Sequence, residues 1–358
     1  MKHILLLIGL SILNGLTYAQ ITMSGNSQHN FFYENQPLKS IKGISWQFKT
    51  AGKGANVPMV VNGVIYSGDD KGNLYALDCN TGKEIWRFMA GSKLHDGPSI
   101  KDQIAYIGTA GGVIYAIDIS TGEEKWRIQT NGSVCNPPAL ADSLGFALSH
   151  DKKLYIFNLE TGLIKDTVPE KYILCGTPSI FKDNLYYPDW GGNFHCRNII
   201  SGKTDLIYQT GVQSKWFTSP SISDSVAYIV NYDSNLYAVN LKDGREIWRF
   251  KADGKLCRAP SISDDLVIFT TTDSHLYALS RKNGNLLWDY RSTGTSWSYP
   301  VIAQDVVYFG CGNGNLYALD IHSGNMLWNY TSDQPINTPV LKDGALYFTS
   351  GQYIIKIE

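Results

Sequence analysis

The strongest constraint on the fold of this chain is a phrase that returns about every 40 residues. The phrase reads Leu-Tyr-Ala-Leu-Asp at 74–78, and a Thr-Gly turn and Trp86 follow it. The turn glycines keep one spacing apart from a single insertion of two residues, and they are Gly82, Gly122, Gly162, Gly202, Gly244, Gly284 and Gly324. Self-similarity at this period predicts a propeller or a solenoid.

Short runs within each repeat alternate apolar and polar residues and are bounded by Gly, Asn and Asp, as at 64–66 and 74–77. Such runs predict strands joined by tight turns, and no sustained 3.6-residue period favours a helical solenoid. One strand follows a proline, one ends near Tyr-x-Gly, one is the Leu-Tyr-Ala strand and one carries the Trp. Four strands in each repeat correspond to one propeller blade. The prolines are Pro58, Pro98, Pro138, Pro178, Pro220, Pro260, Pro300 and Pro339.

The two ends of the repeat region complete each other. Residues 44–50 carry Trp46 and form an outer strand with no blade in front of it, whereas 339–358 supply three strands and stop before a Trp strand. Pairing the two fragments makes an eighth blade and leaves no open edge. We therefore predict an all-β, eight-bladed propeller of four-stranded antiparallel blades over residues 44–358, preceded by a lead-in segment at 20–43.

The N-terminus predicts export. A short basic start at 1–3, an apolar run at 4–16 and small residues before Gln20 are typical of a secretory signal peptide, residues 1–19. An uncleaved anchor is the alternative, but the run is shorter than the roughly 20 residues of a spanning helix. We expect a periplasmic or secreted protein with no transmembrane segment after cleavage. The mature chain is nearly neutral, which excludes nucleic acid as a partner because such binding needs clustered Lys and Arg.

The phrase Tyr-Ala-Leu-Asp-x-x-Thr-Gly-Lys-Glu-x-Trp at 75–86 resembles the PQQ-binding-like repeat, and the resemblance extends from Trp46 to Glu358. That family contains quinoprotein dehydrogenases, which hold pyrroloquinoline quinone (PQQ) and Ca²⁺ over the central axis. It also contains non-catalytic propellers such as the BamB subunit of the outer-membrane barrel assembly machine. The resemblance therefore implies either a PQQ-dependent oxidoreductase or a binding scaffold.

Departures from both family patterns are visible. Quinoprotein alcohol dehydrogenases carry a disulfide between adjacent cysteines and large insertions, whereas this chain has no Cys-Cys pair and uniformly short loops. No Glu, Asn and Asp trio can be aligned as Ca²⁺ ligands. The lipidation cysteine of BamB is also missing. We expect a non-catalytic scaffold in the bacterial cell envelope that binds a protein or glycan at its loop face, with a PQQ- and Ca²⁺-dependent dehydrogenase as the alternative.

The loop that enters each blade and the loop before the Leu-Tyr-Ala strand are expected to share one face around the central channel. At one position of this ring stand His95, Cys135, Cys175 and Cys257. Three interpretations compete there. Cys135 and Cys175 on adjacent blades are placed for a disulfide, the four residues are placed for a soft metal ion, or the thiols only fill the channel mouth.

Two further groups of loop residues are candidates for binding a partner. The first group is basic and comprises Lys53, Lys93, Lys215, Lys255 and Arg258. If these side chains face the axis, they suit an anionic ligand or an acidic peptide. If they do not, they are solvated loop residues. The second group is mostly aromatic, lies near the degenerate third and fourth blades, and comprises His150, Trp190, Trp216, Phe217 and Tyr232. These side chains either contact a protein or a sugar or only pack between loops.

The tryptophans of the outer strands have a structural interpretation, which is packing between neighbouring blades. They are Trp46, Trp86, Trp126, Trp248, Trp288 and Trp328, and Asp166 and Leu206 stand in the corresponding places of blades three and four. No catalytic constellation emerges, because the His and Asp residues are scattered through turns without triad or paired-carboxylate spacing.

Overall fold

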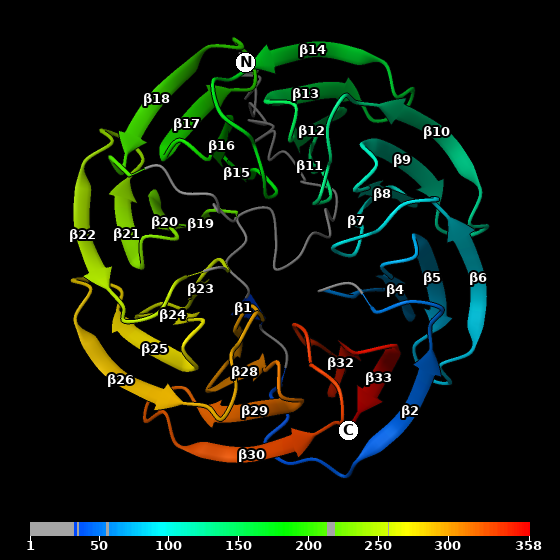
Figure 1. Ribbon diagram of the computed structural model, residues 1–358, viewed down its shortest axis with the longest axis vertical. Coiled ribbons are helices and arrows are strands. Elements are labelled where there is room, and N and C mark those ends of the chain that lie inside the picture. Colours follow the sequence, from blue (N-terminus) through cyan, green and yellow to red (C-terminus); the bar gives the residue numbers. More distant parts are fainter. Residues whose placement is uncertain (1–31, 34–35, 55–56, 213–218, 257) are drawn as a thin grey trace, which may run out of the picture.

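The computed structural model describes residues 32–33, 36–54, 57–212, 219–256 and 258–358. Within these ranges the chain forms eight sheets arranged as a ring, and it contains no helix (Figure 1). Consecutive strands of each blade pair antiparallel, from a short inner strand to an outer strand on the circumference. The prediction of an eight-bladed all-β propeller is confirmed.

The first four blades follow the chain without interruption. Blade one comprises β3 (Met59–Val61), β4 (Val64–Gly68), β5 (Asn73–Asp78) and β6 (Glu84–Met89). Blade two comprises β7 (Ser99–Lys101), β8 (Ile104–Gly108), β9 (Val113–Asp118) and β10 (Glu124–Gln129). Blade three comprises β11 (Ala139–Ala141), β12 (Leu144–Ser149), β13 (Lys153–Asn158) and β14 (Ile164–Pro169). Blade four comprises β15 (Ser179–Phe181), β16 (Asn184–Pro188), β17 (Asn193–Asn198) and β18 (Thr204–Gln209).

The next three blades repeat the same order. Blade five comprises β19 (Ser221–Ser223), β20 (Val226–Val230), β21 (Asn235–Asn240) and β22 (Glu246–Lys251). Blade six comprises β23 (Ser261–Ile262), β24 (Leu266–Thr270), β25 (His275–Ser280) and β26 (Leu286–Arg291). Blade seven comprises β27 (Val301–Ala303), β28 (Val306–Gly310), β29 (Asn315–Asp320) and β30 (Met326–Thr331).

Blade eight closes the ring with strands from both ends of the repeat region. β31 (Val340–Lys342), β32 (Ala345–Ser350) and β33 (Tyr353–Ile357) pair in sequence, and β2 (Ile44–Lys49) completes the sheet by pairing antiparallel with β33. The Glu358 amide also donates to the Gly43 carbonyl at 3.2 Å. The predicted closure is confirmed, because β2 supplies the outer strand of a blade whose other three strands come from the far end of the repeat region.

The lead-in segment contributes contacts that the repeat pattern does not predict. β1 (Phe32–Tyr33) pairs in parallel with β27 and gives blade seven a fifth strand. Further along, the Leu38 carbonyl accepts hydrogen bonds from the Trp328 indole at 2.9 Å and from the Tyr308 hydroxyl at 3.0 Å. The segment therefore contacts the seventh blade both through β1 and through Leu38.

Five of the six repeat tryptophans connect their blade to the next one. The Trp126 indole donates to the Leu159 carbonyl of the following blade at 3.0 Å. Its ring lies so close to Gly162 that a Cβ there would meet Trp126 Cδ2 at 2.7 Å, and Gly162 has a φ of +71°. Glycine is required at this turn both by its backbone conformation and by the indole against it. The same donation to the next blade is made by Trp46, Trp86, Trp248 and Trp288, while Trp328 donates to Leu38.

Blades three and four have no Trp at this position, and Asp166 and Leu206 stand there instead. Asp166 of β14 pairs with Arg197 of β17 at 2.7 Å, and the Arg197 side chain is largely buried. Leu206 of β18 is 54% exposed. Among the described residues, no helix is long and apolar enough to span a membrane.

Candidate functional site

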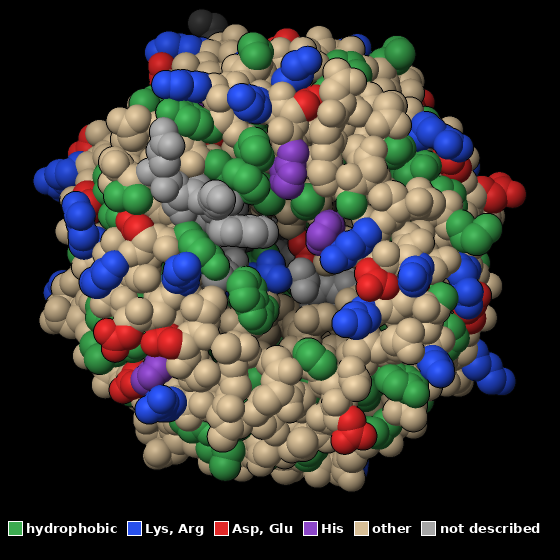
Figure 2. All heavy atoms as spheres, viewed as in Figure 1, with side chains coloured by type: hydrophobic (Ala, Val, Ile, Leu, Met, Phe, Trp, Pro, Cys, Tyr) green, Lys and Arg blue, Asp and Glu red, His purple; other side chains and the backbone are tan. Residues whose placement is uncertain are grey.

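The loops on one face of the ring are tied together in pairs, which places their side chains around the axis. The His150 amide, in the loop after β12, donates to the Ser133 carbonyl, in the loop that enters the same blade, at 2.9 Å. The Ala110 amide donates to Lys93 and the Trp190 amide to Ile173 in the same manner. Figure 2 shows His and basic side chains bordering the centre of this axial face.

Four side chains of this face form what we call the thiol cluster: His95, Cys135, His150 and Cys175. Cys135 lies at its centre, with Sγ 3.6 Å from His150 Nε2. The Cys135 sulfur also lies 3.2 Å from the Ser133 hydroxyl and interacts with Cys175 and His95. Both cysteines are free thiols and are half-buried. The structure thus brings together His150 and three residues of the predicted ring position.

The contacts within the thiol cluster shift the pKa values of its two cysteines in opposite directions. The interaction with Cys175, helped by His150, His95 and Ser133 and opposed by burial, holds the pKa of Cys135 well below its usual value. The same interaction and then burial raise the pKa of Cys175 well above its usual value. The Cys135 sulfur raises the pKa of His150, against burial. Cys135 is therefore the thiolate of the pair, and Cys175 keeps its proton.

The neighbouring side chains hold this cluster in place. The Asn136 amide donates to Asp96 Oδ2 at 2.5 Å across two adjacent blades, and Asp96 is buried. The His150 ring lies 5.4 Å from the Trp190 ring at 59°. Of the predicted aromatic group, His150 and Trp190 thus contact each other.

A second group on the axial face, here called the basic–aromatic patch, comprises Tyr232, Lys255, Arg258, Trp297 and Tyr299. Lys255 Nζ lies 4.4 Å above the Tyr232 ring, and the Arg258 guanidinium lies 5.2 Å above the Tyr299 ring. Arg258 Nε donates to the Trp297 carbonyl at 2.6 Å, and Trp297 is 46% exposed. Cation–π contact restricts both partners, and Lys255 and Trp297 are the exposed members of the group.

The predicted basic residues do not all meet in this patch. Lys53 and Lys93 are exposed and line, with His95 and Asp70, a cavity of about 240 Å³ that blade eight borders through Gln334. Lys215, Trp216, Phe217 and Cys257 lie outside the described residues. The proposed Cys135–Cys175 disulfide stays a prediction, since the two thiols are in contact and unbonded.

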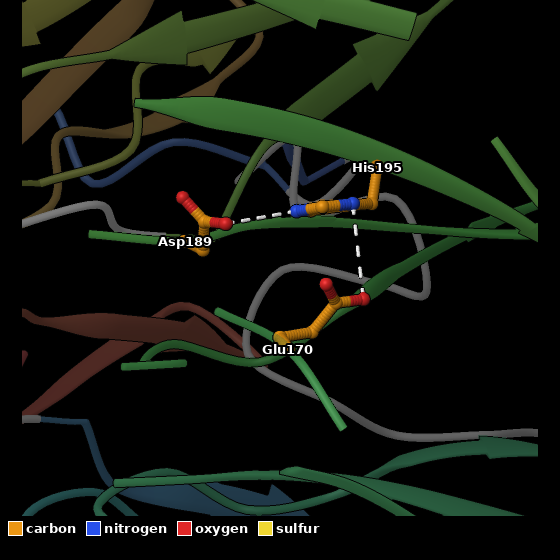
Figure 3. Close-up of side chains that lie close together, drawn as sticks. All are labelled: Glu170, Asp189 and His195. Carbon is orange, nitrogen blue, oxygen red and sulfur yellow. Dashed lines mark hydrogen bonds and ion pairs between the residues drawn. The ribbon is translucent and has the colours of Figure 1, made fainter. Parts of the chain in front are cut away.

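A buried carboxylate–histidine group in blade four was not predicted from the sequence. His195 Nε2 lies 3.0 Å from Asp189 Oδ2, and His195 Nδ1 lies 3.8 Å from Glu170 Oε1 (Figure 3). Ligand atoms of these three residues lie within 4.8 Å of one another, which is close enough to hold a metal ion. The available signal was that His195 occupies the Tyr position of the Leu-Tyr-Ala phrase.

The hydrogen bonds of this group favour a structural role over metal binding. The Asp189 carboxylate already accepts from His195, from the Asn193 side chain and from the backbone of Gly191 and Asn193. Burial raises the pKa of Asp189, but the hydrogen bonds from His195 and Asn193 outweigh it and hold the pKa below its usual value. A metal ion at Asp189 would have to displace these donors.

Sequence reasoning also missed Asp96, Trp297 and Tyr299 as members of the axial face. Trp297 stands at the same ring position as Cys135, so its place was visible from the spacing, whereas the burial of Asp96 and Tyr299 was not. The donors gathered around the described axis are mainly sulfur, imidazole and guanidinium, with Asp96 as a carboxylate. Ca²⁺ takes six to eight oxygen ligands, so these residues do not fit the Ca²⁺ that accompanies PQQ.

The closed ring, the 40-residue repeat and the inter-blade Trp contacts define a PQQ-like β-propeller repeat protein. The family model described as outer membrane protein assembly factor BamB matches residues 42–162, 71–214 and 203–358. The chain belongs to this family. A search among curated proteins finds no match.

Solved structures resemble this chain in fold. BamB from Moraxella catarrhalis has a TM-score of 0.74 at 16% identity, covering 88% of this chain and 99% of its own. Quinohemoprotein alcohol dehydrogenase from Comamonas testosteroni has a TM-score of 0.80 at 11% identity, covering 95% of this chain and 80% of its own. At these identities the similarity establishes the architecture and leaves the activity open.

Proposed function

We propose that this chain is an exported, non-catalytic propeller that binds a protein partner in the bacterial cell envelope, as a factor in outer membrane protein assembly. Membership of the BamB family and the signal-like residues 1–19 support this role. The observation that carries it is Trp297, which is 46% exposed on the axial face while Arg258 holds its backbone. Large exposed aromatic side chains beside Arg are typical of protein interfaces.

The basic–aromatic patch suits an extended segment of a partner that carries acidic side chains. Lys255 and Arg258 provide positive charge, and the rings of Tyr232 and Tyr299 beneath them restrict both cations. Side chains that are already restricted lose less conformational entropy on binding. Charge complementarity would steer the partner to this face, and the Trp297 ring would supply apolar area.

Site-specific photocrosslinking in the native host tests this role. A photoreactive amino acid at position 297 is compared with one at position 287, because Leu287 is 54% exposed but lies on the outer strand β26. We expect discrete crosslinks from position 297 to a protein of outer membrane assembly, and none to that protein from position 287. Equal crosslinking from both positions, or crosslinks to glycan alone, would contradict the proposal.

The PQQ-dependent oxidoreductase is the second candidate, because quinohemoprotein alcohol dehydrogenases share the fold at TM-scores of 0.79 and 0.80. Calorimetric titration of the mature protein with PQQ in the presence of Ca²⁺ separates the two functions. The scaffold predicts no saturable heat. Saturable binding together with a quinone absorbance would favour the enzyme and overturn the scaffold.

A further inference from the structure

We propose that Cys135 and Cys175 form a reactive dithiol on the axial face that exchanges with low-molecular-weight disulfides. Cys135 is the attacking thiol, and Cys175 is the resolving thiol that completes an inter-blade disulfide. The chemistry follows from the thiol cluster alone and is independent of the proposed scaffold role.

The backbone around the two cysteines is fixed in a way that keeps them together. Their loops enter blades three and four at equivalent positions, and the Thr177 hydroxyl donates to the Pro137 carbonyl at 3.0 Å, two residues after each cysteine. The two thiols interact across this boundary. The two cysteine loops are thus held side by side ahead of the inner strands β11 and β15, as an inter-blade disulfide requires.

The surroundings assign the two roles. Cys135 contacts His150 Nε2 at 3.6 Å and the Ser133 hydroxyl at 3.2 Å, and both groups stabilise negative charge on its sulfur. Cys175 keeps its proton because its interaction with the Cys135 sulfur, and then its burial, raise its pKa. A thiolate is the nucleophile in disulfide exchange, so Cys135 reacts first. Its half-buried position admits a small disulfide more readily than the surface of a folded protein.

The exchange balances in two steps. The Cys135 thiolate attacks one sulfur of a disulfide R–S–S–R, forming Cys135–S–S–R and releasing R–S⁻. Cys175 then loses its proton to His150 or to solvent and attacks the Cys135 sulfur, which forms the Cys135–Cys175 bond and releases the second R–S⁻. Two protein thiols are oxidised by two electrons, and the small disulfide is reduced to two thiols.

A soft metal ion is the competing use of these side chains, because Cys and His are ligands of Zn²⁺. The contacts of the thiol cluster, however, all involve the Cys135 sulfur, and Ser133, which is a poor ligand for a soft metal ion, is one of the partners. Among the described residues, the group whose ligand atoms all lie within 4.8 Å of one another is Glu170, Asp189 and His195. A central sulfur with surrounding donors favours an activated thiolate over a shared coordination centre.

Oxidation of the reduced mature protein with glutathione disulfide tests the proposal. After alkylation and tryptic digestion, mass spectrometry should show peptide 128–152, which carries Cys135, linked to peptide 172–182, which carries Cys175. In Cys175→Ser we expect the reaction to stop at a glutathione adduct on peptide 128–152. In Cys135→Ser, glutathionylation of Cys175 should be slower by roughly tenfold or more.

Cys196 provides the matched control, because it is also half-buried but its pKa is raised by burial. Iodoacetamide at about pH 6 should modify Cys135 roughly tenfold faster than Cys196, a difference that disappears in denaturant. The proposal fails if peptide 128–152 links to peptide 256–258, which carries Cys257, if no linked peptide forms at any glutathione ratio, or if Cys135 and Cys196 react alike. Quenching of Cys135 reactivity by stoichiometric Zn²⁺, without disulfide formation, would favour the metal site and also overturn it.

Discussion

His195 Nε2 approaches Asp189 Oδ2 to 3.0 Å, in the place where the Tyr75 hydroxyl of blade one donates to Asp69 Oδ2 at 2.8 Å. The two blades thus satisfy an equivalent buried carboxylate with different donors. Tyr155 and Tyr237 also donate to carboxylates, but to Asp151 and Asp233, which stand two positions further along the turn than Asp69 and Asp189. His195 is therefore a local exchange of donor within a repeated turn, with Glu170 as its additional neighbour.

This relationship predicts that His195→Tyr is tolerated. A tyrosine restores the donor that blade one uses, so we expect a change in the free energy of unfolding within about 1 kcal/mol, whereas His195→Ala should cost about 1–3 kcal/mol by removing a donor to a buried carboxylate. Thermal denaturation of both variants checks this. A His195→Tyr variant as unstable as His195→Ala would indicate that His195 has a role beyond the turn, such as binding a metal ion.

The turn glycines should be sensitive to added side chains to different degrees. Gly162 and Gly91 both have a φ of +71°, but a Cβ at Gly162 would meet Trp126 at 2.7 Å, whereas Gly91 has nothing within 4 Å. Both alanine variants should lose about 1–2 kcal/mol from the left-handed backbone, and Gly162→Ala should lose a further 1–3 kcal/mol or so from overpacking. Parallel denaturant melts measure the difference, and equal losses would show that the indole moves aside without cost.

The charge state of His150 should depend on Cys135. The neighbouring sulfur favours the imidazolium and raises the pKa of His150, while burial acts in the opposite direction. Replacing Cys135 by Ser removes the favourable partner and leaves the burial, so the pKa of His150 should fall, and the ring should lose its proton at a lower pH than in the wild type. NMR titration of the histidine ring protons measures this, with Cys196→Ser as the control that should leave His150 unchanged. An unaltered His150 titration in Cys135→Ser would contradict the assigned contact.

The lead-in segment should stabilise the seventh blade. A chain that begins at Ile44 keeps β2 but loses β1, the two hydrogen bonds to the Leu38 carbonyl, and the packing of Leu38 and Ile41 on the core. Compared with a chain that begins at Phe32, it should melt at a lower temperature by several degrees, consistent with a loss of about 2–4 kcal/mol. Trp328 fluorescence should shift to the red as the indole loses its partner. Identical melting of the two chains would contradict a stabilising role.

The architecture was predictable because the repeat encodes it many times over. Period, turn glycines and the complementary fragments at Trp46 and Glu358 each point independently to a closed ring. β1 was not predictable, since its pairing with β27 depends on a contact across 270 residues and on no repeated signal. A strand of two residues is also too short to show an alternation of apolar and polar residues in the sequence.

The candidate site was predictable only in pieces. Cys135 and Cys175 were placed together by their shared ring position, while His150 was assigned to a separate aromatic group. The hydrogen bond from the His150 amide to the Ser133 carbonyl unites the groups, and it belongs to loop geometry that spacing does not specify. Likewise His195, Asp189 and Glu170 come from β17 and two different loops, so only the packed blade reveals their contact.

The hydrogen bond from the Glu358 amide to the Gly43 carbonyl brings residues 43 and 358 together, so the repeat region closes into a ring without a covalent bond between them. Indole donation between neighbouring blades recurs around much of the ring, as from Trp46, Trp126 and Trp288, so a chain opened elsewhere can keep these contacts. A circular permutant that joins residue 358 to residue 43 through a short linker and opens instead between two other blades would preserve the blade order. The lead-in segment would then be the part of the molecule whose attachment has to be redesigned.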